Sequence, residues 1–268
     1  MGFAYLTNVP LEQARREYLE LLEHQGFEPQ TQVIPVYESC GRVTAEAVYA
    51  HICAPHYTAS AMDGVAVCAR DTFGATETTP VTLHPEQFTV LDTGDPVPEG
   101  RDAVIMVEDL VKNEDGSITI HAAAAPWQHI RQIGEDVCAG EMILPGHMTV
   151  TPAAIGAMIA GGVLKLRVIR RPVVGIIPTG DEIIPPCTDP RPGDILEFNG
   201  SIFSAMVRQW GAEPVVYPIV PDDFDRIKAM VEKASDQCDM VILNAGSSAG
   251  REDFSAQVIR QLGQVLYH

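Results

Sequence analysis

Three short apolar runs alternate with helical segments after Arg171, and this pattern constrains the fold more than any other feature of the sequence. The apolar runs are 173–177, 214–220 and 239–244, and the expected helices lie near 200–210, 224–234 and 254–262. Strands that alternate with helices form right-handed βαβ units around a parallel sheet. The first run is continuously apolar, as expected of a strand that is buried on both faces. The C-terminal part is therefore predicted to be an open, mostly parallel α/β domain.

Each predicted strand is followed by a loop that carries polar residues or glycine. Because the carboxyl ends of parallel strands lie at one edge of a sheet, the three loops are expected to meet there and to bind a ligand. Carboxylates and a glycine-rich loop at one edge suit a phosphate ligand bridged by Mg²⁺. The candidate ligand-binding residues are Thr179, Gly180, Asp181, Gly246, Ser247, Ser248 and Gly250. The candidate acids are Glu182, Asp222 and Asp253, of which Asp222 and Asp253 are the candidate metal ligands.

Several of these residues also have ordinary structural explanations. Asp223, beside Asp222, stands directly before a helical pattern and is expected to cap that helix. Asp253 could be a first-turn acid that favours the helix dipole. Asn199 or Ser201 is expected to cap the helix near 200–210. The sequence contains neither a Walker motif nor a G-x-G-x-x-G fingerprint, which disfavours a nucleotide-dependent oxidoreductase.

The chain before Arg171 has a different character. A helix is expected over residues 10–23, and short strands divided by Gly, Pro and Asp predict an irregular all-β region over about 31–125. Turns and an apolar helix are expected within 140–162. The fold class is therefore α/β plus irregular all-β, in a multidomain chain.

A second group of candidate residues lies on turns of this β-rich part. Asp63, Thr93 and Asp136 stand next to glycines or other acids, and Arg131 precedes Asp136 by five positions. An aspartate such as Asp63 is more often a plain turn residue. The histidines are scattered, which argues against a zinc site, and no nucleophile–His–acid set is recognisable.

Composition narrows the possible partners. The formal net charge is −18, from 36 acidic and 18 basic residues, so nucleic acid and anionic membranes are not expected as partners. No apolar run approaches the roughly 20 residues of a membrane span, and no signal segment is recognisable. Six cysteines occur without a Cys-x-x-Cys pair, which suggests buried free thiols in a cytoplasmic protein.

Several long motifs resemble the MoeA/gephyrin family of molybdopterin molybdenumtransferases. They occur in the family's order over roughly residues 10–268. The matching stretches are SAMDGVAV, TGDPVPEGRDAVIMVE, RQIGEDV, RPVVGIIPTGDEI, FNGSIFSAMV, VPDD and AGSSAGRED.

The resemblance implies a specific chemistry and architecture. The family inserts molybdenum from molybdate into adenylated molybdopterin, releases AMP and uses Mg²⁺. The resemblance implies an elongated homodimer in which the SAMDG region of one subunit approaches the α/β edge of the other. It implies a linker domain formed by residues 1–55 and 126–170, an inserted β-rich domain at 56–125, and a molybdopterin-binding α/β domain at 171–268. The implied catalytic residues are Asp63, Thr93, Asp136, Glu182, Asp222 and Asp253.

Two departures from the family pattern keep an alternative open. The family's glycine loop usually reads Ser-Gly-Gly-Val-Ser-Val-Gly, whereas residues 244–250 read NAGSSAG, with Ala245 at a position that is usually glycine. The chain also ends where the family continues through a lysine-bearing stretch and a further β domain, so an inactive, C-terminally truncated fragment is expected. The alternative function is a non-catalytic protein that keeps the fold and binds molybdopterin as a scaffold.

Overall fold

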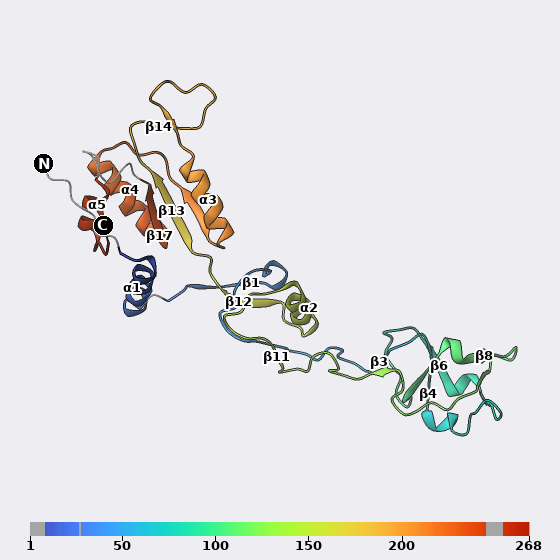
Figure 1. Ribbon diagram of the computed structural model, residues 1–268. Helices are drawn as coiled ribbons and strands as arrows, with labels where there is room; N and C mark the ends of the chain where they lie inside the picture. The colour runs from blue at the N-terminus through green and yellow to red at the C-terminus, as the bar shows by residue number, and fades with distance from the viewer. Residues whose placement is uncertain (1–8, 27, 245–253, 268) are drawn as a thin grey trace. The chain divides into compact units, whose positions relative to one another are not determined.

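The computed structural model describes residues 9–26, 28–244 and 254–267. The chain separates into two compact units (Figure 1). One unit combines Met1–Pro29 with Arg170–His268 and is called the α/β unit below. The other is Gln30–Ile169 and is called the β-rich unit. The two units are described separately.

Strands and helices alternate in the α/β unit in the order that the sequence predicts. Its elements are α1 (Leu11–His24), β13 (Val173–Pro178), β14 (Ile183–Ile184), β15 (Ile195–Leu196), α3 (Asn199–Gln209), β16 (Glu213–Val216), α4 (Phe224–Gln237), β17 (Met240–Asn244) and α5 (Ser255–Leu262). The α/β fold class expected for this part is confirmed.

The main sheet of this unit has the order β16–β13–β17, and both pairings of the central β13 are parallel. The chain passes from the central β13 to its neighbour β16 on one side. It then passes from β16 back across β13 to β17 on the other side. Right-handed crossovers then place α3 and α4 on opposite faces. Figure 1 shows α3 on one side of β13, and α4 and α5 on the other. Helices on both faces explain why the apolar run of β13 is continuous.

The core on one face of the sheet is formed with α4 and α5. It is built from Ile177, Tyr217, Val220, Ile227, Ala234 and Val258. The helix α1 forms where it is expected, but none of its side chains is buried. Its residue Glu17 accepts a hydrogen bond from the hydroxyl of Tyr267, near the other end of the chain.

The β-rich unit contains many short strands, one α-helix and several single 3₁₀ turns. Its strands are β1 (Thr31–Pro35), β2 (Val48–Tyr49), β3 (Ala59–Ser60), β4 (Gly64–Val67), β5 (Val81–Leu83), β6 (Phe88–Leu91), β7 (Ala103–Met106), β8 (Leu110–Lys112), β9 (Ile118–Ile120), β10 (Ile130–Arg131), β11 (Met142–Leu144) and β12 (Lys165–Ile169). Its helices are η1 (Val36–Glu38), η2 (Ala69–Thr72), η3 (Pro85–Gln87), η4 (Val107–Asp109) and α2 (Pro152–Ala160).

Two antiparallel three-stranded sheets, β6–β4–β7 and β5–β9–β8, share one core in this unit. Their buried side chains include Val65, Val67, Leu83, Ile105 and Ile120. A separate core forms where α2 packs near the antiparallel pair β1–β12, around Val150, Met158 and Val168. The two cores are joined by a ribbon in which β2 pairs with β11 and β3 pairs with β10.

The centre of the β6–β4–β7 sheet depends on a glycine. Gly64 begins β4 and lies opposite Met106 of β7. A Cβ atom at Gly64 would overlap the carbonyl oxygen of Ile105. In contrast, a Cβ at Gly156 in α2 would have no neighbouring atom within 4 Å. The close approach of two backbones therefore requires glycine at position 64.

Two local expectations are corrected by the structure, and a third is confirmed. Neither Asn199 nor Ser201 caps α3, because the helix already begins at Asn199 and the carboxylate of Glu197 accepts from the Gly200 N–H at 2.6 Å. β16 is shorter than its apolar pattern, because the ladder is interrupted at Pro218, which has no N–H to donate, before Val220 pairs again with the end of β13. The expected cap at Asp223 is confirmed, since its side chain accepts from the Arg226 N–H at 2.9 Å.

The cysteines are free thiols, but the expectation that they are buried is wrong. Cys40, Cys138 and Cys187 are exposed, and the other three are partly exposed. The exposed cysteines follow turns or lie in loops rather than on the inward face of a strand or helix.

Candidate functional site

The loop that follows β13 is fixed to both neighbouring strand ends. The N–H of Thr179 donates to the carbonyl of Asn244 at the end of β17 (2.9 Å), and the N–H of Gly180 donates to the carbonyl of Val220 (3.1 Å). The Thr179 hydroxyl also donates to the Asn244 carbonyl, at 3.2 Å. Gly180 is buried and has a φ angle of +141°, a conformation that L side chains rarely adopt. Thr179 and Gly180 thus place the acids that follow them at the carboxyl edge of the sheet.

Two of the predicted site residues, Asp181 and Asp222, are linked across neighbouring loops. The Asp181 carboxylate accepts a hydrogen bond from the backbone N–H of Asp222, at 3.2 Å. Glu182 is exposed and lies over the turn, since a Cβ at Gly180 would be 3.2 Å from its Oε2 atom. The predicted convergence of these two loops is therefore observed, and it brings Asp181, Glu182 and Asp222 to one edge.

An open groove of about 570 Å³ lies beside these residues. Prolines and apolar side chains form much of its wall, and its polar lining includes Asp181 and Glu197. Glu197 was not among the predicted site residues. The sequence signal that could have identified Glu197 is an acid shortly before a helix whose first turn contains a glycine. The glycine is needed there because a Cβ at Gly200 would lie 2.9 Å from the Glu197 Oε2 atom.

The remaining candidates at this edge belong to the loop after β17. Gly246, Ser247, Ser248, Gly250 and Asp253 lie outside the described residues. The last described residue before them, Asn244, accepts from the side-chain amide of Asn199 at 3.5 Å. Within the described ranges, no group of three His, Cys, Asp or Glu side chains is arranged to hold a metal ion.

Asp63 and Thr93 are in direct contact in the β-rich unit, although 30 positions separate them. One Asp63 carboxylate oxygen accepts from the Thr93 backbone N–H (2.6 Å) and from the Thr93 hydroxyl (2.8 Å). These two hydrogen bonds, the backbone one first, hold the pKa of Asp63 below its ordinary value. Asp63 is therefore a fixed, ionised carboxylate rather than a loose turn residue.

Asp136 has a different partner. Its two carboxylate oxygens both lie 2.6 Å from Nη2 of Arg131, and this interaction raises the pKa of the arginine. Arg131 lies opposite Ala59 in the pairing of β10 with β3, a few residues before Asp63. The structure thus positions Asp136 by an ion pair near the short strand that leads to Asp63.

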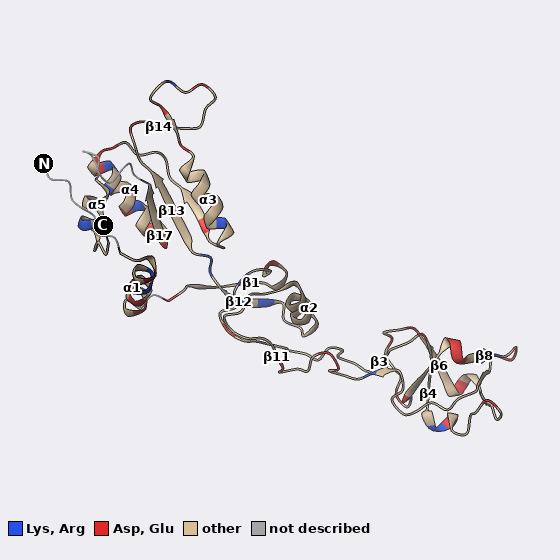
Figure 2. Cartoon of the chain, in the orientation of Figure 1, with Lys and Arg blue, Asp and Glu red and all other residues tan. Residues whose placement is uncertain are grey.

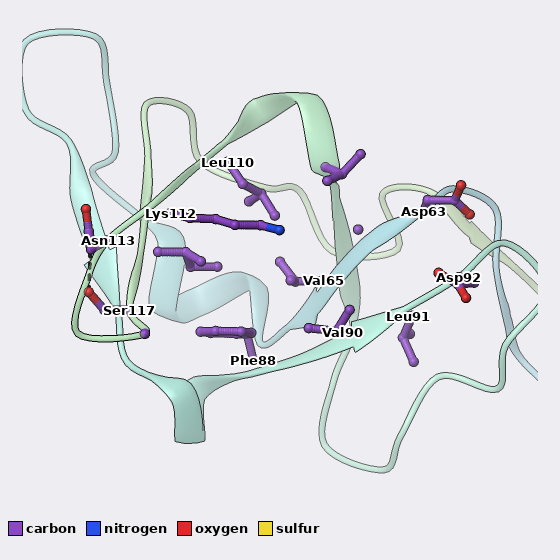
Figure 3. Close-up of a pocket in the computed structure, with 14 residues that line it drawn as sticks. Asp63, Val65, Phe88, Val90, Leu91, Asp92, Leu110, Lys112, Asn113 and Ser117 are labelled. Atoms are coloured by element: carbon purple, nitrogen blue, oxygen red, sulfur yellow. Dashed lines mark hydrogen bonds between the residues drawn. The ribbon is translucent and has the colours of Figure 1, made fainter.

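A pocket of about 330 Å³ adjoins Asp63 (Figure 3). Its walls are mainly apolar and include Val65, Phe88 and Leu110. Figure 3 shows the Lys112 side chain extending over these apolar groups, with its nitrogen toward the middle of the pocket. At the other end, the side-chain amide of Asn113 donates to the Ser117 hydroxyl at 2.9 Å.

Acidic residues occur in both units, as Figure 2 shows, and basic residues are fewer. Within the described residues, no helix is both long enough and apolar enough to cross a membrane.

The chain is an α/β protein in which acids and tight turns lie at the carboxyl edge of the sheet, joined to a β-rich unit. Residues 9–162 match the family model described as "MoeA N-terminal region (domain I and II)". Residues 175–268 match the one described as "Probable molybdopterin binding domain". The chain belongs to the MoeA family.

Curated relatives carry related names. A molybdopterin molybdenumtransferase of Haemophilus influenzae is 32% identical over 96% of this chain and 66% of its own length. Molybdopterin molybdenumtransferase 2 of Mycobacterium tuberculosis is 36% identical over 81% of this chain and 57% of its own. A putative molybdopterin biosynthesis protein of Methanocaldococcus jannaschii is 29% identical over 97% and 69%. The chain therefore spans 57–69% of the length of these relatives.

Solved structures support the same fold. A molybdopterin biosynthesis MoeA protein of Pyrococcus horikoshii matches with a TM-score of 0.79 and 31% identity, over 98% of this chain and 68% of that one. A second structure of a MoeA protein from this organism matches with a TM-score of 0.73 and 32% identity, over 87% and 66%.

Proposed function

We propose that the protein acts in molybdenum cofactor biosynthesis in the cytoplasm, by inserting molybdenum from molybdate into adenylated molybdopterin with release of AMP. The observation that carries the proposal is the link between Asp181 and Asp222 on neighbouring loops of the sheet edge. Relatives named molybdopterin molybdenumtransferase support the reaction class. The match to a molybdopterin binding domain, which starts at residue 175, supports the substrate class.

The acids of the edge suit Mg²⁺ as a cofactor. A phosphate-bound Mg²⁺ is usually held by one or two carboxylates, and substrate phosphates and water complete its shell. Asp222 and Asp181 offer hard oxygen donors of this kind, and Asp253 is a proposed further ligand. When bound, the ion would offset charge on the phosphate that leaves as AMP.

The other residues of the proposed site orient the substrate. Thr179 and Gly180 hold the turn, and Glu182 stands above it as an acceptor for a hydroxyl or amino group of the pterin substrate. Gly246, Ser247, Ser248 and Gly250 are proposed to supply donors to phosphate oxygens. Asp63, Thr93 and Asp136 are proposed as the catalytic residues of the β-rich unit. There, the hydrogen bonds from Thr93 keep Asp63 ionised, and Arg131 fixes Asp136.

The proposed activity is tested with the chain as it stands. Adenylated molybdopterin and molybdate are supplied with and without Mg²⁺, and released AMP is measured together with pterin binding. AMP release that needs both molybdate and Mg²⁺ supports the proposal. Absence of both pterin binding and AMP release would contradict it.

A molybdopterin-binding scaffold is the second candidate function. It is favoured by the sequence NAGSSAG at 244–250, in which Ala245 replaces a glycine that is usual in the family. A Cβ at such a position limits how closely backbone N–H groups can approach a phosphate. Pterin binding without AMP release would select this candidate, and an Ala245→Gly variant that gained AMP release would explain the difference.

A homodimer is the proposed assembly. Sedimentation equilibrium at micromolar concentration is expected to give twice the chain mass of 29.0 kDa. A mass of one chain under these conditions would contradict the dimer but would leave pterin binding to be judged separately.

A further inference from the structure

Two cysteines face each other across the ribbon that joins the two cores of the β-rich unit. Ala54 and Val137 exchange both backbone hydrogen bonds, at 2.8 and 3.1 Å, and so form a hydrogen-bonded antiparallel pair. This bridge places Cys53 opposite Cys138 at the next position. Beyond that position the ladder is interrupted by a turn in which the Glu141 N–H donates to the Cys138 carbonyl.

The position next to a hydrogen-bonded pair is the close one in an antiparallel ladder. Residues opposite each other there have Cα atoms about 4.5 Å apart, which lies within the range of about 4.4–6.8 Å that a disulfide requires. Regular antiparallel geometry next to the Ala54–Val137 bridge would thus give Cys53 and Cys138 the backbone separation of a cross-strand disulfide.

The positions of the sulfur atoms agree with this backbone geometry. A Cβ atom placed on Gly134 would lie 2.8 Å from the Cys138 sulfur and 3.6 Å from the Cys53 sulfur, so both sulfurs border the same small space. The Cys53 sulfur accepts from the Ala139 N–H at 3.3 Å, which places it beside the residue that follows Cys138. The Cys138 thiol donates to the Gly134 carbonyl at 3.4 Å.

Reagents can reach the pair. Cys138 is exposed and Cys53 is partly exposed, and both are free thiols. The hydrogen bond from the Cys138 thiol to the Gly134 carbonyl is a weak one, because a thiol is a poor donor. Exposure and proximity together make these two cysteines a dithiol site.

We infer that Cys53 and Cys138 form a modification site that small-molecule disulfides oxidise to an intramolecular disulfide. The Cys138 thiolate attacks one sulfur of the oxidant, which forms a mixed disulfide and releases one thiol. The Cys53 thiolate then attacks the Cys138 sulfur and releases the second thiol. The two cysteine protons end on the two released thiols, and the two electrons reduce the oxidant's S–S bond.

The cross-link would tie together the two strands of the ribbon close to a candidate catalytic residue. Asp136 lies two positions before Cys138, and its N–H donates to the Ala54 carbonyl at 2.9 Å. Oxidation at this site therefore fastens the segment that carries Asp136 to the strand that carries Cys53. The inference rests on the geometry of the ribbon and is independent of the proposed function.

The test is oxidation of the native chain by glutathione disulfide, followed by alkylation, digestion and mass spectrometry. The expected product is a Cys53–Cys138 peptide cross-link about 2 Da lighter than the two thiol peptides, reversed by dithiothreitol. In urea the yield of this pair relative to other pairs should fall at least about tenfold, because the native register no longer holds the sulfurs together.

Single variants separate this pair from chance reactivity. Cys53→Ser should trap glutathione on Cys138, since the resolving thiol is gone, and Cys187→Ser should leave the cross-link unchanged. The inference is overturned if the wild-type chain retains glutathione on Cys138 beside a free Cys53. It is equally overturned if Cys138 pairs with Cys40 or Cys187 as often as with Cys53.

Discussion

Acids at the two edges of the parallel sheet differ in the hydrogen bonds that they accept. At the amino edge, the Asp239 carboxylate accepts from the Val173 N–H and from Nη2 of Arg170, each at 2.6 Å. At the carboxyl edge, Asp181 accepts one backbone N–H at 3.2 Å, and the described part of the chain offers the Glu182 carboxylate no hydrogen bond or ion pair. Asp239 at the first edge joins neighbouring segments of the sheet, whereas Asp181 and Glu182 at the second keep the acceptor capacity that the proposed function requires.

The largest expected effect is on ligand chemistry at the carboxyl edge. Asp222→Asn removes a charge with little change of shape, so Mg²⁺-dependent AMP release or AMP binding should fall at least about tenfold, or about 1.4 kcal/mol. The thermal midpoint should hardly change. Calorimetric titration of AMP with and without Mg²⁺ measures the effect where turnover is absent.

The neighbouring acid is the matched control. Asp223→Asn makes the same change one residue away, and asparagine caps helices about as well as aspartate, so both stability and Mg²⁺-dependent binding should be retained. Equal losses in the two variants would mean that only the net charge of the edge matters.

A smaller effect, on stability alone, is expected at the amino edge. Asp239→Asn should lower the free energy of unfolding by about 1 kcal/mol, because two charge-assisted hydrogen bonds at a partly exposed site are weakened. Ligand binding should be unchanged. Asp236→Asn is the control, since loss of an acid near the C-terminus of α4 should not destabilise the helix.

The pH dependence of the stability difference between the wild type and Asp239→Asn gives a further check. The Val173 N–H, and then Arg170, lower the pKa of Asp239 from its ordinary value of 3.8. The contribution of Asp239 to the free energy of unfolding is therefore fully present above pH 3.8, and it is lost as the pH falls through the lower folded-state pKa. Urea unfolding of the wild type and Asp239→Asn should differ at neutral pH and converge in acid. A difference in the free energy of unfolding that stayed the same at all pH values would mean that packing, and not the charge of Asp239, causes it.

The smallest effect extends the comparison to the β-rich unit. Thr93→Val removes the hydroxyl donor to Asp63 but keeps the backbone N–H, which is the larger cause of the lowered pKa. The pKa of Asp63 should therefore rise only part of the way to its ordinary value in an NMR titration. Asp115, whose pKa is lowered by Ser117, is the internal reference and should not change. An unaltered Asp63 would show that the backbone bond alone sets its pKa.

Much of the α/β unit could be predicted because its signals are local. The continuous apolar run of β13 and the helical pattern after Asp223 each lie within one short segment. The order of strands then placed the loops of Asp181 and Asp222 at one edge, and the hydrogen bond between them agrees with that inference. The cap of α3 was mispredicted because Glu197 reaches forward from outside the helix, where propensity rules look for Asn or Ser.

The β-rich unit was harder to predict because its contacts are distant in sequence. Asp63 and Thr93 were both singled out, as turn residues and as catalytic residues implied by the family resemblance. Their contact was not predicted, since a pattern of Gly, Pro and Asp does not say which turns meet. The partners of β4 are likewise separated from it by loops, and register depends on packing rather than on local propensity. The same limit concealed the opposition of Cys53 and Cys138.

Gly64 has a consequence for how this protein tolerates sequence variation. Any side chain at this position would push β4 away from the Ile105 carbonyl, and Asp63 would move with it. Gly156 has free space around it and should accept alanine with a gain of roughly 0.5–1 kcal/mol. A saturation-mutagenesis library of this chain should therefore be depleted of every substitution at position 64 while retaining many at 156. The position of Asp63 thus depends on Gly64, a residue that has no side-chain functional group.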